Sequence, residues 1–141
     1  MMRRRHLLLA AAAAVGGALA GCTDRGERIV DPVGRPDVAT FARVRAELFI
    51  PHCIACHNTA GEAGLDLSDN VAYGATVGVD AALFPGWKRI VAGDPAVSLL
   101  YIKVAASGQP GSRMPPAPAA PVDTALVSLL RRWIAAGAPA E

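Results

Sequence analysis

The chain has 141 residues, of which 52% are hydrophobic and 18% are charged, and its formal net charge is +2. This length suits one domain, and the composition is too apolar for general disorder. No apolar stretch of about 18 residues runs without a glycine break, which excludes a protein with several membrane spans. Only 5% of the residues are aromatic, and so small a core usually needs a metal, a cofactor or disulfides.

Residues 1–21 have the layout of a secretory signal peptide. Three arginines at positions 3–5 precede an apolar stretch at 7–20 that is too short to span a bilayer well. The stretch ends in Leu-Ala-Gly-Cys, which resembles the lipobox of bacterial lipoproteins, so we expect cleavage before Cys22 and acylation of that cysteine. Ordinary signal cleavage beside a stray cysteine is the alternative. The expected location is the periplasmic side of a bacterial membrane, with a lipid anchor.

The remaining chain is expected to divide into a tether and one domain. Residues 22–36 mix charge, glycine and proline without helical or strand periodicity, which is typical of a linker. Residues 37–141 form the predicted domain. Once the signal arginines are removed, basic and acidic residues are nearly balanced, and no basic patch argues for a nucleic-acid partner.

Two helices are predicted before the last third of the domain. The first runs from about Val38 to Ile50, with Asp37 as its N-cap, and Pro51 is expected to end or kink it. A second, short helix is predicted from Pro95 to about Ala105, with Asp94 as its cap.

The last helix has the clearest pattern. Asp123 is its expected N-cap and Gly137 its stop signal. Helical spacing predicts one continuous apolar face made of Leu126, Leu129, Leu130, Trp133 and Ile134. Residues 58–93 and 107–121 are rich in Gly, Pro, Asp and Ser and are predicted to be loops. The expected fold is therefore a small all-α domain with three to four helices and long loops.

The chemistry-bearing motif is Cys53-Ile54-Ala55-Cys56-His57. C-x-x-C-H is the attachment signature of c-type haem. Two thiols at this spacing can each form a thioether with a haem vinyl group, and the following histidine can bind the iron as proximal ligand. One covalently bound haem c is the predicted cofactor, held by Cys53, Cys56 and His57.

Three other interpretations of the two cysteines compete with haem. A redox-active C-x-x-C normally opens a helix within a βαβ pattern, which the sequence lacks. A zinc site needs four ligands, and Cys53, Cys56, His57 and His52 are too close together in sequence for easy tetrahedral geometry. A plain structural disulfide is the third alternative.

Met114 is the predicted second axial ligand of the iron. Met1, Met2 and His6 leave with the signal peptide, and His52 is too close to Cys53 to reach the opposite haem face. A thioether is a soft ligand that raises the reduction potential of haem iron. Packing in the core is the alternative role for this methionine.

The order of motifs resembles class I cytochrome c domains, and most closely the branch called planctomycete-type cytochrome c. The resemblance covers roughly residues 38–139. It rests on Cys53–His57, Gly64–Leu67, Gly93-Asp94-Pro95, Ser98–Leu100, Arg113–Pro116 and Leu130–Ala138. It implies first and last helices that cross near the haem edge, axial ligation by His57 and Met114, and one-electron transfer.

Trp87 and Arg89 are weaker candidates, as hydrogen-bond donors to the haem propionates, and a surface loop is the alternative for both. The predicted function is a membrane-anchored electron carrier, not an enzyme, that exchanges electrons with redox partner proteins. One alternative is small-ligand binding or peroxidase-like activity with a labile Met114. Another is a dedicated haem subunit of a larger redox enzyme.

Overall fold

A computed structural model describes residues 38–108 and 110–141, which belong to a unit spanning residues 37–141. The predicted signal peptide, Cys22, the tether and the expected cap Asp37 lie outside the described residues. Within those two ranges, no helix is long and apolar enough to cross a membrane.

The first helix begins at Phe41, three residues later than predicted. The hydroxyl of Thr40 accepts a hydrogen bond from the Arg43 amide at 3.2 Å, so Thr40 is the N-cap and Val38 precedes the helix. Three segments follow one another without interruption: α1 (Phe41–Arg43), a π-helical segment (Val44–Phe49) and α2 (Ile50–His52).

Of the two predicted effects of Pro51, an end to the helix is not observed, because the helix continues to His52. Proline has no N–H to donate, so a regular α-helix would lose a bond here. In the preceding π-helical segment, backbone amides bond to carbonyls five residues earlier instead of four. The amide of Ile50, for example, donates to the carbonyl of Arg45. This π-helical pairing accommodates the proline, and Cys53 follows directly after the last helical residue.

The predicted second helix is divided in two by Ser98. A 3₁₀ turn (Pro95–Val97) is capped by Asp94, as predicted, and α3 (Leu99–Val104) follows. Ser98 has an extended backbone, and its buried hydroxyl donates to the Asp94 carbonyl at 2.7 Å. Local side-chain bonding of this kind competes with helical pairing and explains the break.

The last helix, α4 (Thr124–Ala135), matches its prediction closely. The carboxylate of Asp123 accepts from the Ala125 amide at 2.7 Å. Four members of the predicted apolar face are fully buried and the fifth, Leu126, is partly buried.

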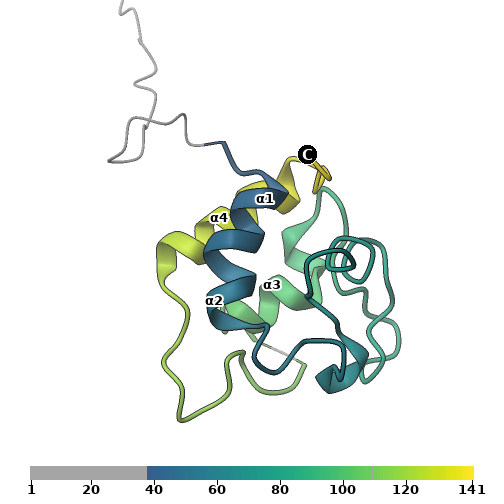
Figure 1. The fold of residues 1–141 in the computed structure, drawn as a ribbon, viewed down its shortest axis with the longest axis vertical. Coiled ribbons are helices and arrows are strands. Elements are labelled where there is room, and N and C mark those ends of the chain that lie inside the picture. The colour runs from purple at the N-terminus through teal and green to yellow at the C-terminus, as the bar shows by residue number, and fades with distance from the viewer. Residues whose placement is uncertain (1–37, 109) are drawn as a thin grey trace, which may run out of the picture. The chain divides into compact units, whose positions relative to one another are not determined.

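The core lies where α4 packs against the first helix and α3. Figure 1 shows α1 crossing in front of α4. At this crossing the ring of Phe41 lies 5.5 Å from that of Trp133 and 5.3 Å from that of Tyr73. Val44, Leu48 and Phe49 from the first helix complete the buried cluster.

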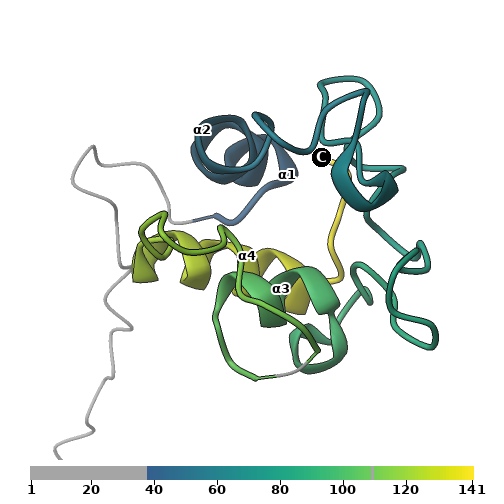
Figure 2. The same ribbon diagram turned by 90° about the horizontal axis from the view of Figure 1, so that it is seen from below.

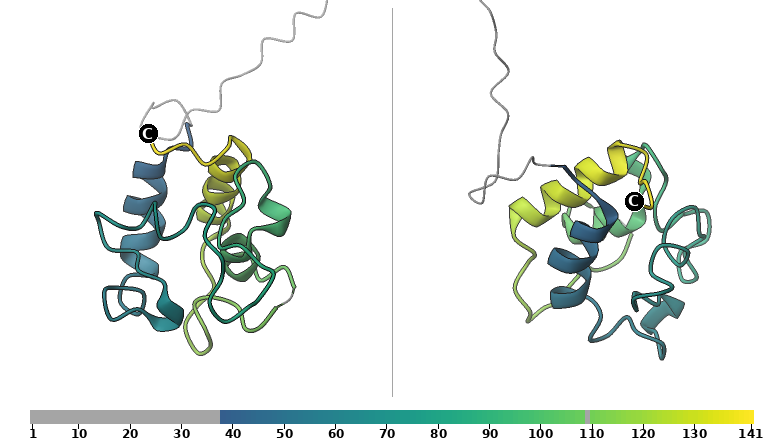
Figure 3. Two further views of the ribbon diagram at one scale, coloured as in Figure 1. Left: turned by 90° about the vertical axis from the view of Figure 1, so that its right-hand side faces the viewer. Right: turned by 45° about the horizontal axis from the view of Figure 1, so that its top comes forward.

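The described residues contain helices and isolated β-bridges, such as Val77 with Ile90, but no strand, in agreement with the predicted all-α class. Besides one 3₁₀ turn (Glu62–Gly64), the chain between Cys53 and Asp94 is irregular. Figures 2 and 3 show that these loops lie on one side of the helices. Several of their residues, such as Leu65 and Phe84, line a cavity.

Candidate functional site

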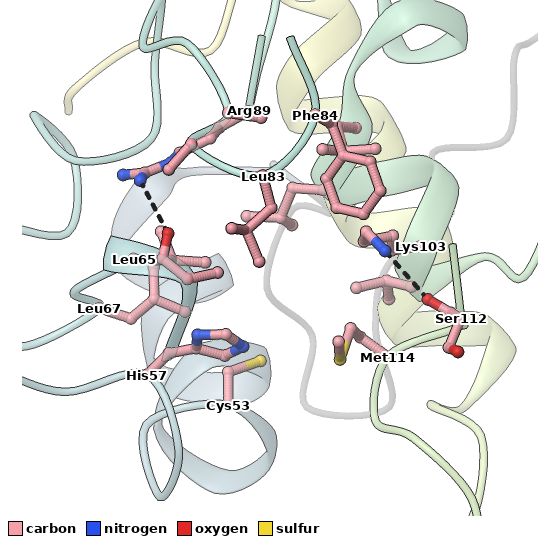
Figure 4. A pocket seen from close by; sticks show the side chains of 16 residues that line it. Cys53, His57, Leu65, Leu67, Leu83, Phe84, Arg89, Lys103, Ser112 and Met114 are labelled. Atoms are coloured by element: carbon pink, nitrogen blue, oxygen red, sulfur yellow. Dashed lines mark hydrogen bonds between the residues drawn. The ribbon is translucent and has the colours of Figure 1, made fainter. Parts of the chain in front are cut away.

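The predicted haem residues surround two adjoining cavities. Cys53, His57 and Met114 line a cavity of about 290 Å³, and Figure 4 shows all three side chains facing it. The same three residues and Cys56 line a smaller cavity of about 60 Å³. Most other residues around the larger cavity are apolar. The structure thus brings together the four residues singled out by the sequence.

The cysteine motif forms a tight turn directly after the first helix. The amides of Cys56 and His57 both bond to the Cys53 carbonyl, at 3.2 and 2.9 Å. Both cysteines are free, with Cys53 half-buried and Cys56 exposed. Burial raises the pKa of the Cys53 thiol to about 11, so this group is neutral near pH 7. Its sulfur lies 3.6 Å from the Leu48 carbonyl.

The ring of His57 is oriented by a backbone carbonyl. Its Nδ1 atom lies 3.1 Å from the carbonyl oxygen of Glu62. Because a carbonyl only accepts, this bond requires the proton on Nδ1 and leaves Nε2 with a free lone pair. Metal-binding histidines usually show this second hydrogen bond.

Arg89 supports the loop that carries the Glu62 carbonyl. Its Nη2 donates to the Gly64 carbonyl at 2.8 Å, and its Nη1 donates to the Ala75 carbonyl at 2.7 Å. Arg89 also lines the larger cavity, and Figure 4 shows its bond to this loop. Trp87 is not among the residues that line either cavity in the described part of the chain. The predicted propionate contacts of Arg89 and Trp87 stay predictions.

Met114 is held from α3, by a residue that the sequence analysis did not single out. The Met114 amide donates to the Lys103 carbonyl at 2.9 Å. The Lys103 ammonium group donates to the Ser112 carbonyl at 3.1 Å. Both Lys103 and Ser112 line the cavity beside Met114 (Figure 4). In the sequence, Lys103 is one of several residues within the helix predicted from Pro95 to about Ala105, and no local signal distinguishes it.

The donor atoms around the cavities fit a covalently bound haem. Two thiols, one imidazole nitrogen and one thioether sulfur are the groups needed for attachment and axial ligation, and the apolar lining suits a large flat macrocycle. Within residues 38–108 and 110–141, no group of three or more His, Cys, Asp or Glu side chains is arranged to hold a metal ion.

Comparison with protein families gives an independent result. Residues 53–118 match the family model described as planctomycete cytochrome C, and this segment contains the whole cysteine motif and Met114. Searches of curated proteins and of solved structures found no significant match. A cytochrome c domain implies covalently bound haem c, and such domains generally transfer electrons rather than act as enzymes. Residues 53–118 are therefore similar to the planctomycete cytochrome C family, the family that the sequence motifs resemble.

Proposed function

We propose that this protein is a mono-haem c-type cytochrome that carries single electrons. Cys53 and Cys56 would hold the haem through thioether bonds, and His57 and Met114 would be its axial ligands. The observation that carries the proposal is that these four side chains line adjoining cavities, although Met114 comes from a distant part of the chain.

Each of these residues has a separate task. Cys53 and Cys56 would each hold the haem through a thioether, formed by addition of the S–H group to a vinyl double bond with no leaving group. His57, oriented by the Glu62 carbonyl, offers Nε2 to the iron. Met114 offers a soft thioether, which favours the ferrous state. When bound, the haem supplies a reversible one-electron change between ferric and ferrous iron.

The ligand set supports a carrier rather than an enzyme. If His57 and Met114 both bind the iron, protein atoms would take the positions at which a substrate could otherwise coordinate. The apolar lining, which includes Leu65, Leu67 and Leu99, would limit the contact of a bound haem with water. Exclusion of water keeps solvent reorganisation small when the charge of the site changes. Redox proteins would serve as electron donor and acceptor.

We propose further that the domain is tethered to the periplasmic side of a membrane. The support comes from the sequence alone: an arginine-led apolar segment that ends at Cys22, followed by a linker. Replacement Cys22→Ser should move the protein from the membrane fraction to the soluble fraction, with its haem content unchanged. Retention in the membrane fraction would count against the anchor.

The proposed cofactor is tested by the intact mass of the denatured protein, purified from cells that contain cytochrome c maturation machinery. The mass of one haem should stay attached after denaturation. A matched sample of the double variant Cys53→Ala/Cys56→Ala should show only the polypeptide and any lipid. If the unsubstituted protein also lacks the added mass, covalent haem attachment is disproved.

A further inference from the structure

Lys103 makes two contacts with the segment that carries Met114. It lies in the last turn of α3, half-buried, at the edge of the larger cavity. Its carbonyl accepts the amide of Met114 at 2.9 Å, and its ammonium group donates to the carbonyl of Ser112 at 3.1 Å. One helical residue therefore ties down the chain at Met114 itself and two residues before it.

The ammonium group of Lys103 is partly shielded from solvent by its neighbours. It lies 4.4 Å from the centre of the Phe84 ring, a distance at which cation and ring attract each other. Gly111 closes the third side, because a Cβ atom there would lie 3.0 Å from both Lys103 Nζ and Phe84 Cζ. The partial loss of water also lowers the pKa of Lys103.

Arg113 binds the same loop in a different manner. Its guanidinium group donates to the carbonyls of Pro115 and Ala119, which belong to the loop itself. These bonds shape the loop internally. The bonds of Lys103, in contrast, connect the loop to α3, which packs on α4 and forms part of the cavity wall.

We propose that Lys103 is a positioning residue that holds Met114 at the cavity through its ammonium bond to the Ser112 carbonyl. This inference rests on the proposed axial ligation by Met114. Removal of the ammonium group leaves the backbone bond to the Met114 amide but releases the preceding residues. Met114 should then leave the iron more often.

The test is a titration of the full-length ferric holoprotein with imidazole, which binds the iron only when Met114 has left. Loss of a charged hydrogen bond at this half-exposed site should tighten the apparent imidazole affinity of Lys103→Leu by about tenfold. The methionine–iron charge-transfer absorption should weaken in parallel. Lys103→Arg, which keeps a cationic donor, should restore both properties most of the way.

Lys88→Leu is the matched control. The ammonium group of Lys88 also binds a loop carbonyl, that of Gly78 at 3.0 Å, and also Asp80 at 2.7 Å, but Lys88 lines neither cavity. This variant should bind imidazole with the same affinity as the unsubstituted protein. If Lys103→Leu does not accumulate as holoprotein, Lys103→Gln replaces it, with a smaller shift expected in the same direction.

The variant Met114→Ala distinguishes the positioning role of Lys103 from the axial ligation by Met114 on which it rests. If Met114→Ala tightens imidazole binding while Lys103→Leu and Lys103→Gln match the unsubstituted protein, the positioning role is overturned and axial ligation by Met114 stands. If Met114→Ala itself changes neither the imidazole affinity nor the charge-transfer absorption, the proposed ligand set is overturned as well.

Discussion

On the His57 side of the cavity, the hydrogen bonds of His57 itself are made with the irregular loop that follows it in the chain. The amide of Leu67 bonds to the His57 carbonyl at 2.9 Å, and the Glu62 carbonyl lies 3.1 Å from the His57 ring. On the Met114 side, the corresponding bonds reach across from α3, through Lys103. His57 is therefore held by its own irregular loop, which Arg89 braces from further along the chain, whereas Met114 is held by a helix that forms part of the cavity wall.

The largest expected effect comes from removal of both cysteines. Cys53→Ala/Cys56→Ala should abolish covalent haem attachment and leave the larger cavity unfilled. An empty cavity of this size costs on the order of several kcal/mol, which is comparable to the total stability of a small domain. Thermal unfolding followed by circular dichroism should lose its cooperative transition. A cooperative, native-like transition in the haem-free variant would show that the helices fold without the cofactor.

Met114→Ala should act on one side of the cavity only. The reduction potential should fall by about 0.1–0.2 V, a part of the ~0.8 V range that axial ligands span, because the thioether no longer favours ferrous iron. Covalent haem should be retained in full, since Cys53, Cys56 and His57 are untouched. Potentiometric titration checks the potential, and an unchanged value would remove Met114 from the ligand set.

Arg89→Leu should affect the opposite side. Two of its bonds, to the carbonyls of Gly64 and Ala75, join loops on the His57 side, and their loss should lower the free energy of unfolding by about 1–3 kcal/mol. Imidazole affinity should change much less than in Lys103→Leu. Urea denaturation measures the stability, with Arg131→Leu on the exposed face of α4 as the control. If Arg89→Leu and Lys103→Leu change the imidazole affinity equally, Lys103 has no specific effect on the Met114 side of the cavity.

The smallest effect is expected from Gly111→Ala. At φ +73° an alanine is strained by about 1 kcal/mol, and its Cβ would also press on Lys103 Nζ and Phe84. Gly78→Ala has the same strain, at φ +74°, with no atom within 4 Å of the added Cβ. Both variants should therefore lose some stability, but only Gly111→Ala should tighten imidazole binding. If Gly111→Ala and Gly78→Ala have the same imidazole affinity, the loop around Gly111 moves to fit the added Cβ atom without displacing Lys103.

Local patterns predicted several elements accurately because their causes are local. The caps Asp94 and Asp123 each bond to a backbone amide two residues ahead, and α4 buries the face that helical spacing selects. The predicted bounds of the first two helices were wrong where the hydrogen bonds depart from the regular α-helical pattern. The π-helical segment before Pro51 carries the helix past the proline, and Ser98 divides the second helix.

The sequence by itself determined the cysteine motif and the helical pattern of α4, because each depends on residue types at fixed spacing. It predicted Met114 as a ligand by elimination, because Met1 and Met2 lie in the predicted signal peptide. Tertiary structure alone decided that Met114 faces the same cavity as His57, and that Lys103 and Arg89 brace the two opposite loops. The acceptors of these two cations are backbone carbonyls, which every residue has. No residue pattern marks such an acceptor, so only the packed chain shows which carbonyl each cation reaches.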